Sequence, residues 1–204
     1  MKYHLSRGGR RAIAVMAGIA VAALAITSAA FAATSSGASP GSGAASAAIP
    51  KCTAALGQYG NVSVWVADGQ GSGAAGTIYY PLEFTNLSGH TCSMHGFPGV
   101  SAISRGGQQL GSPANWESGG SFGTPRTVLV APGATVHAIL AYHDVVVSTP
   151  PACDPVNTTF ELRVYPPDQR SAGFAFFGLQ ACSHAGPVYL SVGPIKAGVG
   201  TING

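Results

Sequence analysis

Two histidines that flank a cysteine are the residues of this chain best suited to chemistry, in the segment His90-Thr91-Cys92-Ser93-Met94-His95. Imidazole, thiolate and thioether groups together suit copper, and imidazole also suits zinc. A blue-copper loop needs Cys, His and Met in that order, whereas Met94 precedes His95 here. We therefore interpret this segment as a surface turn in which two histidines lie beside a disulfide. A copper or zinc site at His90 and His95 is the alternative interpretation.

A second pattern resembles the nucleophile motif of serine hydrolases. The segment Gly119-Gly120-Ser121-Phe122-Gly123 has the spacing GxSxG, and Asp168 and His184 follow in the hydrolase order. That nucleophile needs a strand, a sharp turn and a helix around it, whereas this segment lies in a run rich in Ser, Gly and Thr. We interpret it as a loop and predict no catalytic residues. A secreted serine hydrolase using Ser121, Asp168 and His184 is the less favoured alternative.

Two further patterns are weaker. Residues 71–76 read GxGxxG, but a nucleotide-binding loop must lead into a helix, and an alternating strand pattern follows here. We therefore expect an inter-strand loop. His143 and Asp144 could form an acid–base pair, but neighbouring residues of a strand point to opposite faces. We expect His137 and His143 to be exposed histidines at strand ends.

Aromatic side chains within a long polar loop are the candidates for contact with a partner. The stretch from Gly106 to Pro125 contains Trp116 and Phe122 among many Gly and Ser residues. Exposed aromatic side chains supply much of the binding energy at interfaces and form platforms for protein or glycan partners. We therefore predict that Trp116 and Phe122 are binding residues.

The distribution of charge argues against nucleic acid as a partner. Four of the ten basic residues lie within the first eleven positions, which leaves six basic against seven acidic residues in the rest of the chain. A protein that neutralises many phosphates needs a basic patch, and none is available. Charged residues make up 8% of the chain, well below the roughly 25% of typical globular domains. Uncharged polar residues must therefore cover much of the surface.

The N-terminus has the three parts of a secretory signal peptide. Residues 1–32 contain a basic start, an uncharged apolar stretch and the sequence Ala30-Phe31-Ala32, which suits signal peptidase. We predict cleavage after Ala32 and no membrane span in the mature protein. Residues 33–50 are rich in Ala, Ser, Gly and Pro, and we predict a flexible linker there. Residues 51–204 then form a single domain.

Four cysteines, an even number in an exported chain, predict two disulfides with three possible pairings. We prefer Cys52–Cys92 and Cys153–Cys182, because each pair brackets one half of the domain. A zinc site is the rival interpretation, but zinc sites usually contain CxxC pairs, and none occurs here.

The hydrophobic pattern predicts β-strands throughout the domain. We expect Pro81 at a sheet edge or a bulge because proline lacks an N–H, and a type II turn at Pro132-Gly133. Regular turn signals favour a sandwich or a barrel. The expected strands cover residues 61–67, 77–85, 97–103, 127–131, 135–143, 160–165, 174–178 and 188–192.

Several segments give the chain a resemblance to a known family. They include Lys51-Cys52-Thr53-Ala54, Tyr80-Pro81-Leu82-Glu83-Phe84-Thr85-Asn86, Gly96-Phe97-Pro98-Gly99-Val100-Ser101, Leu110-Gly111-Ser112-Pro113-Ala114, Ala131-Pro132-Gly133-Ala134 and Leu162-Arg163-Val164-Tyr165-Pro166-Pro167. With Cys92, Cys153 and Cys182 they resemble the actinobacterial secreted family called domain of unknown function 4232. The resemblance implies an Ig-like antiparallel β-sandwich with disulfides paired in sequence order. It implies no activity, cofactor or catalytic residue.

Together these observations predict a secreted or envelope-associated, non-catalytic β-sandwich that binds an unidentified extracellular or cell-wall partner. We expect no cofactor and no nucleic acid. Metal binding at His90 and His95 is the alternative function, followed by serine hydrolysis.

Overall fold

The computed structural model describes residues 48–55, 61–67, 71–146, 153, 156–184, 186 and 188–201, all within the unit formed by residues 46–204. The predicted signal peptide and most of the predicted linker lie outside the described residues. The end of that linker is held to the domain, because the Pro50 carbonyl accepts a hydrogen bond from Ser93 N at 2.9 Å. Within these ranges no helix is long and apolar enough to cross a membrane.

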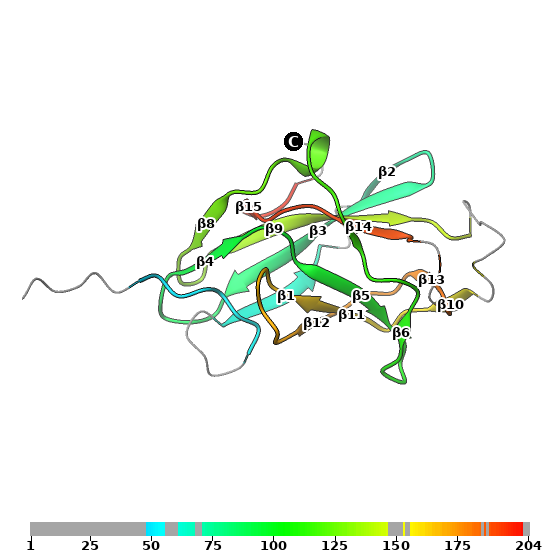
Figure 1. Cartoon of the computed structure of the whole chain (residues 1–204), viewed down its shortest axis with the longest axis horizontal. Coiled ribbons are helices and arrows are strands. Elements are labelled where there is room, and N and C mark those ends of the chain that lie inside the picture. Colours follow the sequence, from blue (N-terminus) through cyan, green and yellow to red (C-terminus); the bar gives the residue numbers. More distant parts are fainter. Residues whose placement is uncertain are drawn as a thin grey trace, which may run out of the picture. The chain divides into compact units, whose positions relative to one another are not determined.

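The domain is an all-β sandwich built around two main sheets (Figure 1). The first sheet has the strand order β1-β3-β9-β14-β7, with β2 paired to β3 and β15 paired to β9. Its strands are β1 Val62–Val66, β2 Ser72–Ala74, β3 Thr77–Asn86, β7 Asn115–Trp116, β9 Thr135–His143, β14 Leu190–Val192 and β15 Lys196–Ala197. The second sheet has the order β12-β11-β5-β6 and consists of β5 Gly99–Ile103, β6 Gln109–Leu110, β11 Glu161–Tyr165 and β12 Gly173–Phe176.

Two small sheets complete the described part of the chain. One pairs β4 Cys92–His95 with β8 Thr127–Val130, and the other pairs β10 Val156–Thr158 with β13 Gln180–Cys182. A 3₁₀ turn, η2 Gly120–Phe122, lies between β7 and β8. Among the described strand pairs, only β14 and β7 run parallel.

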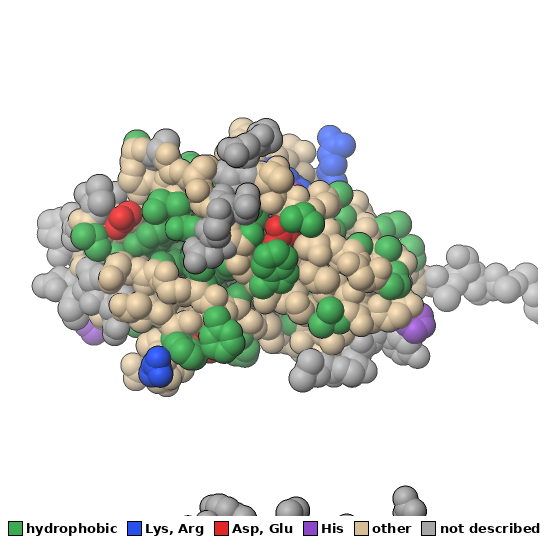
Figure 2. Space-filling view, turned by 180° about the vertical axis from the view of Figure 1, so that it is seen from behind, with side chains coloured by type: hydrophobic (Ala, Val, Ile, Leu, Met, Phe, Trp, Pro, Cys, Tyr) green, Lys and Arg blue, Asp and Glu red, His purple; other side chains and the backbone are tan. Residues whose placement is uncertain are grey.

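The core forms because alternate residues of both main sheets point into the space between them. Leu82 and Leu140 from the first sheet share one buried cluster with Leu162 and Val164 from the second, and all four are fully buried. The predicted antiparallel sandwich is therefore confirmed. On the face shown in Figure 2, charged side chains are few and lie among hydrophobic and uncharged polar surface.

Both predicted disulfides are present, Cys52–Cys92 and Cys153–Cys182. The first joins the N-terminal segment to β4, where Cys52 N also donates to Ser93 O at 2.9 Å. The second joins Cys153 to β13. All four sulfurs are fully or almost fully buried with their residues, so the two crosslinks form part of the core.

The prediction that Pro81 lies at a sheet edge or a bulge is wrong. Pro81 lies inside β3, which pairs with β9 on one side and with β1 and β2 on the other. Its carbonyl accepts a hydrogen bond from Ala67 N, so the Pro81 nitrogen faces the same side, in the gap between β1 and β2. No strand there requires an N–H donor, and the hydrogen bonds to β9 are unaffected.

The predicted turn at Pro132-Gly133 is confirmed. Gly133 has a φ of 73°, and Ala134 N donates to Ala131 O at 3.0 Å, which closes the turn between β8 and β9. A positive φ at this position favours glycine. The turn thereby places β9 beside β3 along its whole length.

Candidate functional site

Aromatic and polar side chains come together in a groove of about 500 Å³ beside Trp116, which we call the Trp116 groove. Three parts of the chain build it. The link from β4 to β5 supplies one wall, β7 supplies the indole, and the turn after β11 supplies the polar rim. Its principal lining residues are His95, Phe97, Trp116, Tyr165, Asp168 and Gln169.

Trp116 is exposed yet fixed in place. Its side chain is 65% exposed, although burial would be the default for so large an apolar group. The indole stacks on Phe97 with ring centroids 5.5 Å apart and an interplanar angle of 13°, and its Nε1–H donates to Pro98 O at 3.2 Å. The backbone of β7 is held in turn by its parallel pairing with β14, which places Trp116 beside Val192.

The polar rim is arranged by a turn and an ion pair. Gln169 N donates to Pro166 O at 3.0 Å, and Asp168 adopts a φ of 58°, a conformation that Asp tolerates better than most residues. Lys51 Nζ lies 2.7 Å from Asp168 Oδ2. This hydrogen bond and the Lys51 charge, with a smaller contribution from His95, hold the pKa of Asp168 below its usual value. Asp168 is thus an ionised hydrogen-bond acceptor at neutral pH.

The first disulfide positions one half of that ion pair. Lys51 precedes Cys52 directly, and Lys51 also forms a bridge with Ser93 of β4. The crosslink therefore fixes the backbone from which the Lys51 side chain reaches Asp168. Together these features create a groove with an aromatic wall and hydrogen-bonding groups along its rim.

The two histidines proposed as metal ligands both lie at the surface. His90 is in the turn before β4, where its carbonyl accepts hydrogen bonds from Asn86 Nδ2 at 2.8 Å and Ser88 Oγ at 3.0 Å. His95 ends β4 and lines the Trp116 groove. In the part of the chain that the structure describes, no three His, Cys, Asp or Glu residues are grouped as metal ligands. Metal binding at this pair stays a prediction.

The residues of the hydrolase alternative are not joined to one another. Ser121 lies in η2, where its carbonyl accepts a hydrogen bond from Lys196 Nζ at 2.6 Å. Asp168 belongs to the Trp116 groove, and His184 is exposed in the bend after β13. No hydrogen bond connects any two of these three described side chains. Ser121 also has no helix behind it, so the strand–turn–helix that activates such a serine is missing at this position.

Phe122 differs from Trp116 in its surroundings. Its ring is half-buried, lies edge-on to Tyr79 with centroids 6.2 Å apart, and packs against the backbone of Gly193. These contacts anchor η2 to the first sheet. Phe122 as a binding residue stays a prediction, and the geometry of the groove gives it no place there.

The glycine-rich segment 71–76 forms β2 and the turn of a β-hairpin. Ala75 and Gly76 have φ values of 51° and 80°, as in a tight two-residue hairpin turn. β3 follows at once, so no helix N-terminus is available to hold a pyrophosphate. The expected inter-strand loop is therefore limited to the turn at Ala75 and Gly76, and Ser72–Ala74 form a strand instead.

The expectation that His137 is exposed is wrong. His137 is 8% exposed because the segment after β15 covers this part of β9, and the His137 Nδ1–H donates to Gly198 O at 2.8 Å. Burial lowers the pKa of His137. The hydrogen bond to Gly198 opposes this shift, and the positive charge of Lys196 adds to it. His143, as expected, is exposed at the end of β9, with Nδ1 at 2.8 Å from Thr77 Oγ1.

Sequence reasoning missed most of the Trp116 groove. Phe97 and Tyr165 were interpreted as parts of structural motifs, and Gln169 carried no signal of its own. Phe97 lies about 70 positions before Tyr165 and Gln169 in the chain, and the antiparallel pairing of β5 with β11 brings Gly99 opposite Tyr165. Pairing between distant strands is the information that a local pattern lacks.

Comparison with known proteins gives one informative match. Residues 52–196 match the family model described as Domain of unknown function (DUF4232). No curated protein and no solved structure matches the chain. The matched residues include both disulfides and all but a few residues of the described sandwich. The chain therefore belongs to the DUF4232 family.

Proposed function

We propose that this domain is a non-catalytic binding module, exported to the cell envelope or surroundings of an actinobacterium, which holds a saccharide in the Trp116 groove. One observation carries the proposal: the indole of Trp116 is 65% exposed and yet fixed by Phe97 and by the Pro98 carbonyl. A large aromatic surface held rigid in water loses little side-chain entropy when a ligand covers it. Two disulfides support export, because they persist in oxidising compartments.

A saccharide fits the chemistry of this groove. The C–H groups on one face of a sugar ring pack against an aromatic ring, and the sugar hydroxyls pair with carboxylate and amide groups. Trp116 and Tyr165 offer the aromatic surface, while Asp168 and Gln169 offer the polar groups. Because Lys51 neutralises Asp168, the rim has little net charge and suits an uncharged ligand.

The size of the groove favours a saccharide over a folded protein. Its volume of about 500 Å³ lies within the range of small-ligand pockets, roughly 300–1,000 Å³. A standard protein interface instead covers about 800 Å² on each partner. A short stretch of a cell-wall polysaccharide is a ligand of the right dimensions.

Co-sedimentation with insoluble bacterial cell-wall polysaccharide tests this proposal, with Trp116→Ala compared against Trp65→Ala. Trp65 is the matched control, since it is 41% exposed, lies on β1 and bonds Thr85 Oγ1 at 3.2 Å, away from the groove. We expect Trp116→Ala to weaken binding about 30-fold, as for an interface hot spot. Equal loss in the two variants, or no sedimentation of the wild type with any wall polysaccharide, would contradict the proposal.

A further inference from the structure

We propose that a second pocket, on the outer face of the first sheet, binds a small organic carboxylate through the ammonium group of Lys196. The pocket has a volume of about 450 Å³ and shares no lining residue with the Trp116 groove. The inference is therefore independent of the proposed function. We call it the Lys196 pocket.

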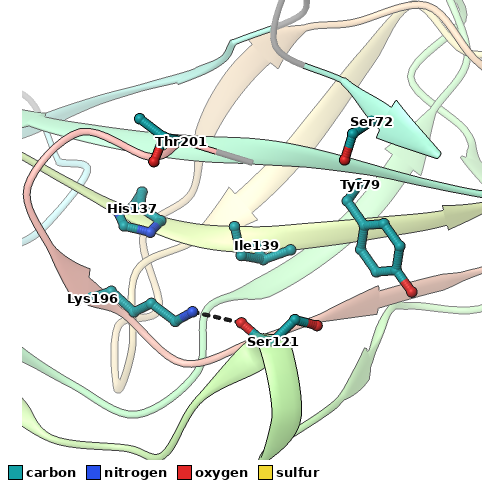
Figure 3. A pocket seen from close by; sticks show the side chains of 7 residues that line it. All are labelled: Ser72, Tyr79, Ser121, His137, Ile139, Lys196 and Thr201. Atoms are coloured by element: carbon teal, nitrogen blue, oxygen red, sulfur yellow. Dashed lines mark hydrogen bonds between the residues drawn. The ribbon is translucent and has the colours of Figure 1, made fainter. Parts of the chain in front are cut away.

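Four separate parts of the chain build the Lys196 pocket (Figure 3). The β2–β3 hairpin contributes Ser72 and Tyr79, η2 contributes Ser121, and β9 contributes His137 and Ile139. β15 and the residues after it contribute Lys196 and Thr201. In Figure 3 the Lys196 side chain runs beneath His137 and Ile139 to Ser121, with Tyr79 on the far side of Ile139.

Lys196 has no carboxylate partner in the described chain. Its Nζ donates to the Ser121 carbonyl at 2.6 Å, and the ion pair between Lys51 and Asp168 lies elsewhere. An ammonium group has three donors, so two remain for a ligand. Partial burial also lowers the pKa of Lys196, because removal from water disfavours the charged form. A bound anion would give the ammonium group the carboxylate partner that the described chain does not provide.

The rest of the lining favours a hydroxylated ligand. The side-chain hydroxyls of Ser72, Tyr79, Ser121 and Thr201 line the pocket, and none bonds another described residue. Ile139 provides an apolar surface between them. Hydroxyl groups both donate and accept hydrogen bonds, so they complement a ligand that carries hydroxyls beside its charged end.

The pocket is preformed because the segment after β15 is held at three points. Glu83 Oε1 accepts the Gly200 N–H at 2.8 Å, His137 bonds Gly198 O, and Lys196 pairs with His137 across β15 and β9. A Cβ on Gly200 would lie 2.5 Å from Pro81 Cβ, so the segment lies directly on the sheet. Glu83 is fully buried beneath it and does not line the pocket.

A single ammonium group in the described part of the pocket selects a monoanion. A phosphate dianion is typically held by several cations or by a nest of backbone N–H groups, and neither lines this pocket. A carboxylate needs one ammonium group and a few hydroxyl donors, which the described lining supplies. The ligand class is therefore a small hydroxylated monocarboxylate.

An NMR titration of the protein with gluconate tests the inference, and the neutral polyol sorbitol serves as the matched ligand. We expect gluconate to shift the amide signals of Tyr79, Ser121, His137 and Thr201 in a saturable manner. Lys196→Met should weaken gluconate binding about 10- to 100-fold, the effect of losing a charge-assisted hydrogen bond. Lys196→Arg should retain most of it, and Arg170→Met, which removes an exposed charge elsewhere, should leave it within about twofold.

Three outcomes would overturn the inference: sorbitol binding as tightly as gluconate, equal weakening by Lys196→Met and Arg170→Met, or signal shifts confined to other parts of the domain. If Lys196→Met does not fold, the comparison of gluconate with sorbitol on the wild type still decides the question. Failure here would leave the Trp116 groove untouched, since its test uses other residues and uncharged ligands.

Discussion

Glu83 on β3 lies directly opposite His137 on β9, and both side chains bind the backbone of the same segment after β15. Glu83 is fully buried, and its Oε2 has no hydrogen-bond partner among the described residues. Two titratable groups therefore hold residues 198–200 on the sheet. Their pKa values are shifted in opposite senses, and each predicts its own pH dependence of stability.

Glu83 should make the domain less stable as pH rises above about 4.5, the ordinary value for a glutamate. Burial raises its pKa, and the hydrogen bond from Gly200 only partly opposes this. The folded state therefore binds a proton that the unfolded state has lost, and the stabilisation disappears as pH passes the raised pKa. Chemical denaturation from pH 4 to pH 8 measures the effect. Glu83→Gln keeps the acceptor oxygen, so it should remove this slope without unfolding the domain.

His137 should act in the opposite direction. Burial lowers its pKa, so the unfolded state binds a proton more readily than the folded state. Stability should consequently fall as pH drops below about 6.5, the ordinary histidine value. His137→Asn retains a donor near the Nδ1 position for Gly198 O and should abolish this dependence. An unchanged low-pH slope in His137→Asn would assign the slope to other groups.

Gly200 is predicted to tolerate no side chain. An added Cβ would lie 2.5 Å from Pro81 Cβ, 3.0 Å from His137 Cγ and 3.1 Å from Glu83 Oε1. We expect Gly200→Ala to lower the free energy of unfolding by about 1–3 kcal/mol through overpacking. Gly178→Ala is the control, because open space surrounds that position, and it should change stability by less than about 0.5 kcal/mol. Comparable effects of the two variants would show that the segment is not pressed on the sheet.

The local pattern was sufficient for the long strands and insufficient for the short ones. Alternation of Leu82 and Phe84 with outward-facing residues marks β3, whereas β9 is marked by a nearly continuous apolar run. β7 and β15 contain two residues each and exist only because β14 and β9 lie beside them. No alternation can be recognised over two residues, so such strands depend on tertiary context.

The site was predictable only in part for the same reason. Trp116 was recognised because a large aromatic residue stands out in a polar loop. Its support from Phe97 and Pro98 required the path of the link from β4 to β5, which is irregular. The burial of His137 required knowledge of where residues 198–200 run, and nothing in the sequence of β9 indicates their path.

The two disulfides should differ in their contribution to stability. They close loops of 40 and 29 residues, for which loop entropy gives about 4 kcal/mol for Cys52–Cys92 and about 3.5 kcal/mol for Cys153–Cys182. Paired Cys→Ala variants and thermal unfolding measure both losses. Removing Cys52–Cys92 should also free Lys51 from Asp168 and weaken saccharide binding, whereas removing Cys153–Cys182 should not. Unchanged saccharide binding in the variant without Cys52–Cys92 would show that this disulfide does not position the groove.

The central claim is that a saccharide stacks on Trp116. The chain has two tryptophans, so Trp65→Phe leaves Trp116 as the single tryptophan emitter. Titration of this variant with soluble cell-wall oligosaccharides should shift or quench its emission in a saturable manner, at the affinity that calorimetry gives for the wild type. Binding by calorimetry with no change in Trp116 emission would contradict the claim.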